Sequence, residues 1–140
     1  MSQENVELVL RGYRAFVAGD LVSIGEMLDP DIEWMAIDAG LSDHAHRDDV
    51  IGILAERLKD GYRVELERCI GVGDEIVVAF RAAGVEKDAH DERPLQTRRY
   101  FTVGRYWAVV TVRDGRVVRV YDYPNLTAAL EAVGLEGEID

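Results

Sequence analysis

Two histidines lie in the acidic stretch SDHAHRDD at residues 42–49, where they could ligate a metal ion or form part of a catalytic cluster. A His-x-His pair such as His44 and His46 supplies only two zinc ligands, and no third ligand residue is spaced nearby. Asp48 and Asp49 instead suit the first turn of a helix, whose N-terminal end carries partial positive charge. We therefore predict that this stretch leads into a helix, with no metal ion and no cofactor.

Composition excludes several classes of partner. The chain has 140 residues, one cysteine and a formal net charge of −11. This charge disfavours nucleic acids and membrane surfaces as partners, because both are anionic. No apolar run approaches the roughly 20 residues of a membrane span, and residues 1–10 lack the basic-then-apolar order of a signal peptide. Cys69 cannot form a disulfide within the chain. We expect one domain over residues 1–140, located in the cytoplasm.

The spacing of apolar residues changes along the chain from helical to extended. Helical spacing predicts helices at residues 5–18, 21–28 and 48–61, and a short helix at 125–134. Alternation predicts strands at residues 31–37, 62–72, 75–84, 100–112 and 116–123. The polar segment 85–99, which contains His90, is predicted to be an exposed loop. Helices segregated from a mostly antiparallel run of strands indicate an α+β fold.

Three strings along the chain carry a family resemblance. AFVAGDLVSIGEMLDPDIEW at residues 15–34, VTVRDGRVVRVYDY at 110–123 and AALEAVGL at 128–135 resemble the SnoaL-like branch of the nuclear transport factor 2-like superfamily. HRDDV at 46–50 is similar to a Gly-Arg-Asp-x-Val string that opens the third helix in the epoxide hydrolases of that superfamily. The resemblance implies a cone with an apolar interior pocket, in which three N-terminal helices and a short C-terminal helix wrap a curved sheet. It also implies a dimer. Because the superfamily includes isomerases, cyclases, hydrolases and non-enzymatic domains, the fold does not determine the function.

The string RDGR between the last two strands predicts how those strands face. Asp114-Gly115 between alternating apolar residues is typical of a two-residue type I′ turn, which sets Arg113 opposite Arg116. If every pair keeps the offset set by this turn, side-chain alternation defines two faces. One face would carry Arg105, Trp107, Val109, Thr111, Val118, Val120 and Asp122, and the other Tyr106, Ala108, Val110, Arg119, Tyr121 and Tyr123.

The resemblance implies which face is inside. YDY at 121–123 is similar to a family string whose aspartate points into the pocket, which puts Asp122 inside, opposite Trp107 and diagonal to Arg105. A carboxylate in an apolar pocket is costly unless it is paired or protonated, and Arg105 is the nearest candidate cation. Asp122 could then act as a general acid or base. Equally, it could form a structural ion pair or bind backbone amides where the helix at Asn125 begins. The opposite face would be the homodimer interface.

Residue-by-residue comparison with the family's enzymes removes two activities. The epoxide hydrolases need polar residues where this chain has Trp34 and Ala36 on the first strand. They also need polar residues on a middle strand, near Phe80 and Ala82 of this chain. The ketosteroid isomerases need a base at Ala36 and a second acid near Ala108, and neither is present. The polyketide cyclases need one acid/base carboxylate in an apolar pocket, which Asp122 could supply.

The predicted function follows from the pocket. We expect a SnoaL-like protein that binds a small apolar or aromatic molecule, with an isomerase or polyketide-cyclase-type enzyme and a non-catalytic interaction domain as alternatives. The same side chains could instead simply fill a core. The predicted lining is Tyr13, Trp34, Ala36, Phe80, Arg105, Trp107, Val109 and Val120, with Asp122 as the candidate catalytic residue.

Overall fold

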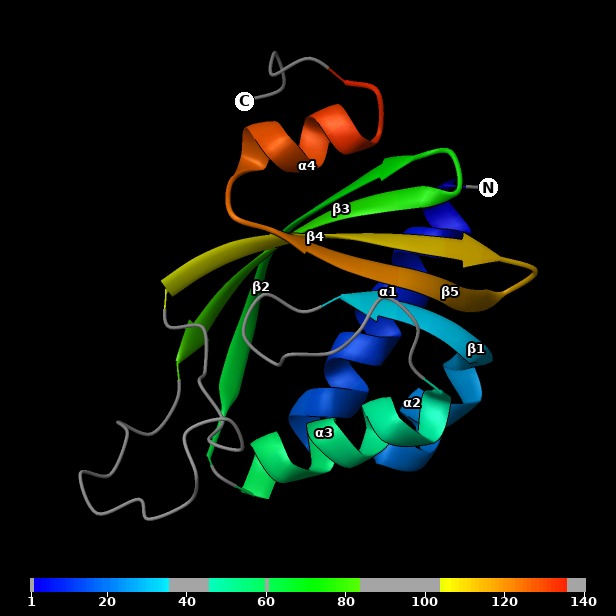
Figure 1. Cartoon of the computed structure of the whole chain (residues 1–140), viewed down its shortest axis with the longest axis vertical. Helices are drawn as coiled ribbons and strands as arrows, with labels where there is room; N and C mark the ends of the chain where they lie inside the picture. The colour runs from blue at the N-terminus through cyan, green and yellow to red at the C-terminus, as the bar shows by residue number, and fades with distance from the viewer. Residues whose placement is uncertain (1, 36–45, 60, 84–103, 136–140) are drawn as a thin grey trace.

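The computed structural model describes residues 2–35, 46–59, 61–83 and 104–135. In chain order they form α1 (Ser2–Ala18), α2 (Leu21–Met27), β1 (Leu28–Met35), α3 (Arg47–Lys59), β2 (Arg63–Val72), β3 (Glu75–Ala83), β4 (Gly104–Arg113), β5 (Arg116–Tyr123) and α4 (Leu126–Ala132) (Figure 1). The predicted order of elements and the α+β class are confirmed. The predicted loop at 85–99 lies outside the described residues. None of the described helices is long and apolar enough to cross a membrane.

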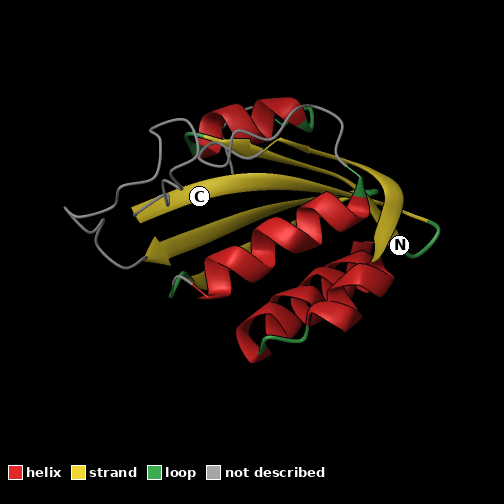
Figure 2. Cartoon of the chain, turned by 60° about the horizontal axis from the view of Figure 1, so that its bottom comes forward, coloured by secondary structure: helices red, strands yellow, loops and turns green. Residues whose placement is uncertain are grey.

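The strands form one curved sheet in the order β1-β5-β4-β3-β2. Neighbours are antiparallel except β1 and β5, which run parallel. The helices α1, α2 and α3 lie on one side of this sheet and α4 lies on the other (Figure 2). We call the side that faces α1–α3 the inner face and the side that carries α4 the outer face.

Local side-chain contacts explain where three helices begin. The Asp20 carboxylate accepts a hydrogen bond from the Ser23 backbone N–H at 3.1 Å, which satisfies one of the free donors at the start of α2. Asn125 accepts from the Ala128 N–H at 2.8 Å and caps α4 in the same way. His46 caps α3, because its Nδ1 accepts from the Asp48 N–H at 3.1 Å. Residues 46–49 were therefore correctly predicted to lead into a helix, and residues 42–45 lie outside the described residues.

The first strand begins earlier than predicted. β1 starts at Leu28 rather than at residue 31, so it includes Pro30. A proline has no backbone N–H to donate to a neighbouring strand, but among the described strands β1 pairs with β5 alone and lies at the edge of the sheet. The proline can therefore lie within the strand without removing an interior ladder bond.

The turn between β4 and β5 has the predicted geometry. Asp114 and Gly115 have φ of 51° and 75°, as a type I′ turn requires, and Arg113 pairs with Arg116. Beyond Val112 the pairing departs from the prediction, since Val112 pairs with Val117 but Thr111 pairs with Arg119.

Val118 is thus an extra residue, a β-bulge that shifts the register by one. Trp107 pairs with Tyr123, and Ala108, not Trp107, pairs with Asp122. The predicted faces of β4 were wrong for this reason, because a one-residue shift exchanges the two faces of a strand relative to its neighbour.

Two clusters of buried side chains lie on the two faces of the sheet. The larger lies on the inner face and includes Ile32, Val50, Ile76 and Val78, each at most 1% exposed. The smaller joins the outer face to α4 and consists of Val77, Val109, Ala129 and Leu130. The inner cluster is the one that borders the candidate site.

Candidate functional site

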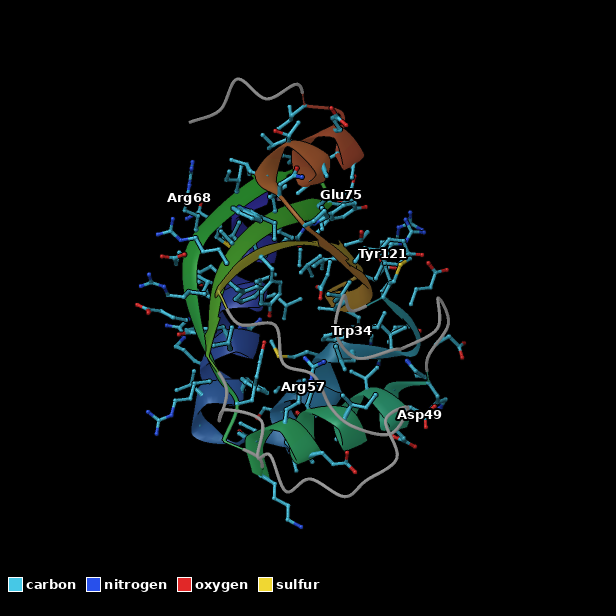
Figure 3. The ribbon with its side chains drawn as sticks, turned by 60° about the vertical axis from the view of Figure 1, so that its left-hand side comes forward. Trp34, Asp49, Arg57, Arg68, Glu75 and Tyr121 are labelled. Carbon is cyan, nitrogen blue, oxygen red and sulfur yellow. The ribbon has the colours of Figure 1, made fainter. Side chains whose placement is uncertain are left out.

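A cavity of about 170 Å³ lies between the inner face of the sheet and the three N-terminal helices. Most of its wall is aliphatic or aromatic. Figure 3 shows Trp34 and Arg57 in the space between α3 and the curved sheet, whereas Arg68 points away from the molecule. The lining residues are Leu8, Val9, Gly12, Tyr13, Phe16, Ile24, Met27, Leu28, Trp34, Leu54, Arg57, Tyr62, Val64, Phe80, Tyr106, Ala108, Val110, Val117, Val120 and Asp122.

Besides Tyr13 and Trp34, four polar side chains from four different segments lie in this wall: Arg57, Tyr62, Tyr106 and Asp122. The hydroxyls of Tyr62 and Tyr106 are 3.4 Å apart, and either can donate to the other. The Arg57 guanidinium lies over the Tyr62 ring, 5.3 Å from its centroid, in a cation–π contact. Arg57 and Tyr62 are only 8% and 5% exposed. This cluster, which we call the polar wall, can orient a polar atom of a bound molecule inside an otherwise apolar space.

Tyr106 is the most strongly perturbed member of the polar wall. Burial raises the pKa of its phenol far above the ordinary value, and the Tyr62 hydroxyl and the negative charge of Asp122 raise it further. The Arg57 charge acts in the opposite direction but does not offset these effects. Tyr106 therefore stays protonated at physiological pH and keeps an O–H that can donate a hydrogen bond.

Five of the predicted site residues line the cavity and three do not. Tyr13, Trp34, Phe80, Val120 and Asp122 are in its wall. Ala36 lies outside the described residues. Arg105, Trp107 and Val109 are instead on the outer face.

The bulge at Val118 accounts for these three residues. Trp107 and Val109 pack with the α4 cluster, on the opposite side of the sheet from the cavity. The Arg105 Nε lies 3.0 Å from Glu67 Oε1, in an exposed ion pair. Arg105 is therefore not the predicted cation beside Asp122, and the cation that acts at the polar wall is Arg57.

Sequence reasoning missed Arg57, Tyr62 and Tyr106. A helical pattern did contain a signal for Arg57, because it lies three residues after Leu54 and seven after Val50, on the same face of α3. Tyr62 begins the alternation with Val64 that points into the cavity. Tyr106 was assigned to the outer face because the bulge was not recognised.

Comparisons with known proteins identify the family of this chain. A family model described as the SnoaL-like domain matches residues 9–120. The chain belongs to this family. Among curated proteins, a search for relatives of this SnoaL-like chain found no match.

Solved structures share the fold of the SnoaL-like chain. A putative polyketide cyclase from Xanthomonas campestris pv. campestris is 26% identical, with a TM-score of 0.64, over 94% of this chain and 98% of that one. TerC, co-crystallized with polyporic acid, is 22% identical, with a TM-score of 0.64, over 94% of this chain and 98% of that one. Bal32a, from a soil-derived mobile gene cassette, is 18% identical, with a TM-score of 0.67, over 87% of this chain and 89% of that one. The last two similarities concern the fold alone.

A second polar group of the SnoaL-like domain lies on its outer face. Glu33 on β1 accepts hydrogen bonds from Arg119 Nε at 3.0 Å and from the Tyr121 hydroxyl at 3.1 Å. The Arg119 guanidinium also lies over the Tyr121 ring, 5.3 Å from its centroid. Arg119 and Tyr121 are thus on the face predicted for them, where they tie β5 to the parallel strand β1.

The histidine stretch of the SnoaL-like domain shows no metal centre within its described part. His46 is exposed and acts as the helix cap, and His44 lies outside the described residues. Among the residues that the structure describes, no three of His, Cys, Asp or Glu are placed to hold a metal ion.

Proposed function

We propose that this SnoaL-like domain binds a small apolar or aromatic molecule in its interior cavity. The observation that carries the proposal is a cavity of about 170 Å³ whose apolar wall includes one polar cluster. Apolar cavities of roughly 150 Å³ in other proteins stay dry and bind benzene.

A thermal-shift screen with a varied apolar library tests this proposal. A ligand at 100 times its Kd adds about 2.7 kcal/mol to the free energy of unfolding, which raises the Tm by roughly 5 to 10 °C in a chain of this size. We expect at least one apolar or aromatic class to raise the Tm of the wild type. If no compound in the library does so, the non-catalytic interaction domain becomes the better description.

We also propose, as a second candidate, that Asp122 acts as a general acid or base on the bound molecule. Asp122 lines the cavity, and its negative charge acts on Tyr106 in the same wall. A carboxylate beside a protonated phenol can remove a proton while the phenol donates a hydrogen bond to a carbonyl oxygen. The similarity to the putative polyketide cyclase, which is 26% identical, supports this reaction class.

The Asp122→Asn variant tests this second candidate, with Asp74→Asn as its matched control at an exposed turn. For an enzyme, Asp122→Asn loses turnover of a ligand found in the screen but retains much of the affinity. For a binding protein, neither the wild type nor the variant turns the ligand over. A large loss of stability in Asp122→Asn alone would indicate a structural role for this carboxylate.

For the assembly, we propose a homodimer through the outer face of the sheet. Arg119, Tyr121 and Tyr123 lie on that face, and tyrosine and arginine are enriched in interfaces. Light scattering should give twice the 15.7 kDa chain mass. A mass equal to one chain would refute the proposal. A cytoplasmic location stays a prediction from the single cysteine.

A further inference from the structure

We propose that the natural ligand of the cavity is a neutral, single-ring phenol whose hydroxyl binds at the polar wall. This inference rests on the proposed function and specifies the chemical class of the ligand. Three properties of the cavity carry it: its volume, the opposite charges in its wall, and the hydrogen-bonding capacity of the two tyrosines.

The volume limits the ligand to one ring with small substituents. An apolar cavity of roughly 150 Å³ in another protein binds one benzene ring, so a cavity of about 170 Å³ suits a single ring with small substituents. The walls on both sides are regular elements, since Phe16 and Ile24 come from helices and Val110 and Val120 from the centre of the sheet. Enlarging the cavity for a skeleton of three or more fused rings would require these packed elements to separate.

The charges in the wall favour an uncharged ligand. Arg57 and Asp122 carry opposite charges, and both act on the Tyr106 hydroxyl. A ligand carboxylate bound there would face the Asp122 carboxylate, and a ligand ammonium would face the buried Arg57 guanidinium. Because a charged ligand would be repelled by one of these two charges while the other attracts it, a ligand without net charge is the best match.

The tyrosine pair favours a hydroxyl as the ligand's polar group. Either Tyr62 or Tyr106 can donate to the other across their 3.4 Å contact, and when Tyr62 donates, the Tyr106 O–H can donate to a ligand. Asp122 is a diagonal neighbour of Tyr106 on the inner face, since it pairs with Ala108. A phenol can accept from Tyr106 and donate to the Asp122 carboxylate at the same time. A carbonyl oxygen can only accept, and a hydrocarbon can do neither.

Isothermal titration calorimetry with four matched probes tests the inference. The probes are 4-ethylphenol, 4-ethyltoluene with the same shape but no hydroxyl, 4-ethylbenzoate with a charge, and 9-phenanthrol with three fused rings. We expect 4-ethylphenol to bind about thirtyfold more tightly than 4-ethyltoluene, because its hydroxyl would make two hydrogen bonds of about 1 kcal/mol each. We expect no saturable binding of 4-ethylbenzoate or 9-phenanthrol.

Variants identify the group that binds the hydroxyl. Tyr106→Phe should weaken 4-ethylphenol binding about tenfold and leave 4-ethyltoluene unchanged. Tyr121→Phe, which removes a phenol hydroxyl on the outer face, is the matched control and should change neither. If Tyr106→Phe does not fold, Tyr62→Phe removes the other hydroxyl of the pair. The binding of the four probes to the wild type tests the inference without any variant.

The results separate failure of the inference from failure of the proposed function. Three results would each overturn the phenol class but keep a ligand-binding cavity. The first is equal affinity for 4-ethylphenol and 4-ethyltoluene, and the second is tight binding of 4-ethylbenzoate or 9-phenanthrol. The third is an affinity for 4-ethylphenol that neither Tyr106→Phe nor Tyr62→Phe changes. Absence of binding by all four probes, together with no hit in the apolar screen, would overturn both.

Discussion

Filling the cavity with a protein side chain is the most direct test of whether the space is open. Ala108 is 1% exposed, lies at the centre of β4 and lines the cavity. The substitution Ala108→Leu adds three carbon atoms pointing into that space. At about 0.8 kcal/mol per buried methylene, full accommodation would stabilise the protein by up to about 2.4 kcal/mol.

The assay is urea denaturation followed by circular dichroism, with the Tm measured in parallel. We expect the Tm of Ala108→Leu to rise by roughly 5 to 8 °C and the variant to lose binding of any ligand found in the screen. Ala129→Leu is the matched control, because Ala129 is 0% exposed but packs between α4 and the outer face rather than against the cavity. Overpacking there should destabilise the protein by about 1 to 3 kcal/mol.

A loss of stability in Ala108→Leu as large as that in the control would refute the reasoning. It would mean that the inner face has no free space beside Ala108 and that the surrounding side chains fill a core. Retained ligand binding in a stabilised Ala108→Leu variant would mean instead that the ligand binds elsewhere.

Three further predictions concern helices and pH. Gly12→Ala should stabilise α1 by about 1 kcal/mol, because alanine has the higher helix propensity and the added Cβ meets only the Met27 side chain, at 3.7 Å. Gly52→Ala in α3, where the added Cβ has no atom within 4 Å, is the control. Denaturant titrations should show a similar gain in the free energy of unfolding for both variants. Asn125→Ala should destabilise the protein by about 1 kcal/mol, because it removes the cap of α4, and Asn125→Asp should retain most of the stability; equal loss in both would contradict the capping role. The raised pKa of Tyr106 means that its contribution to stability is complete below the unfolded pKa of 10.0 and is lost as pH rises above it, so the wild type should lose more stability between pH 9 and pH 11 than Tyr106→Phe. Equal losses would show that Tyr106 ionises as readily in the folded protein as in the unfolded chain.

Local interactions made much of the fold predictable. The type I′ turn depends on two adjacent residues, Asp114 and Gly115, that tolerate positive φ. The caps Asp20 and Asn125 each bind a backbone N–H three residues later in the chain. Such contacts involve neighbours in sequence, so a sequence pattern contains nearly all the information that determines them. The periodicity of each helix and strand has the same origin.

Contacts between distant segments decided the rest. The sequence by itself determined that Asp122 and Val120 share a face, since both belong to one uninterrupted part of β5. Only the tertiary structure decided that Tyr106 and Ala108, rather than Trp107 and Val109, face the cavity with them. The physical reason is the bulge at Val118: one extra residue shifts the pairing of the two strands by one position, and the hairpin's alternating pattern is compatible with either register.

The polar wall, too, is formed by contacts between segments that are distant in the sequence. Arg57, Tyr62 and Tyr106 belong to segments separated by up to 49 positions in the numbering. Their meeting depends on how α3 packs over the curved sheet, which is decided by burial of the apolar cluster around the cavity rather than by any local motif. The elements of this protein were therefore determined by contacts between sequence neighbours, whereas the chemistry of its cavity was determined by how those elements pack together.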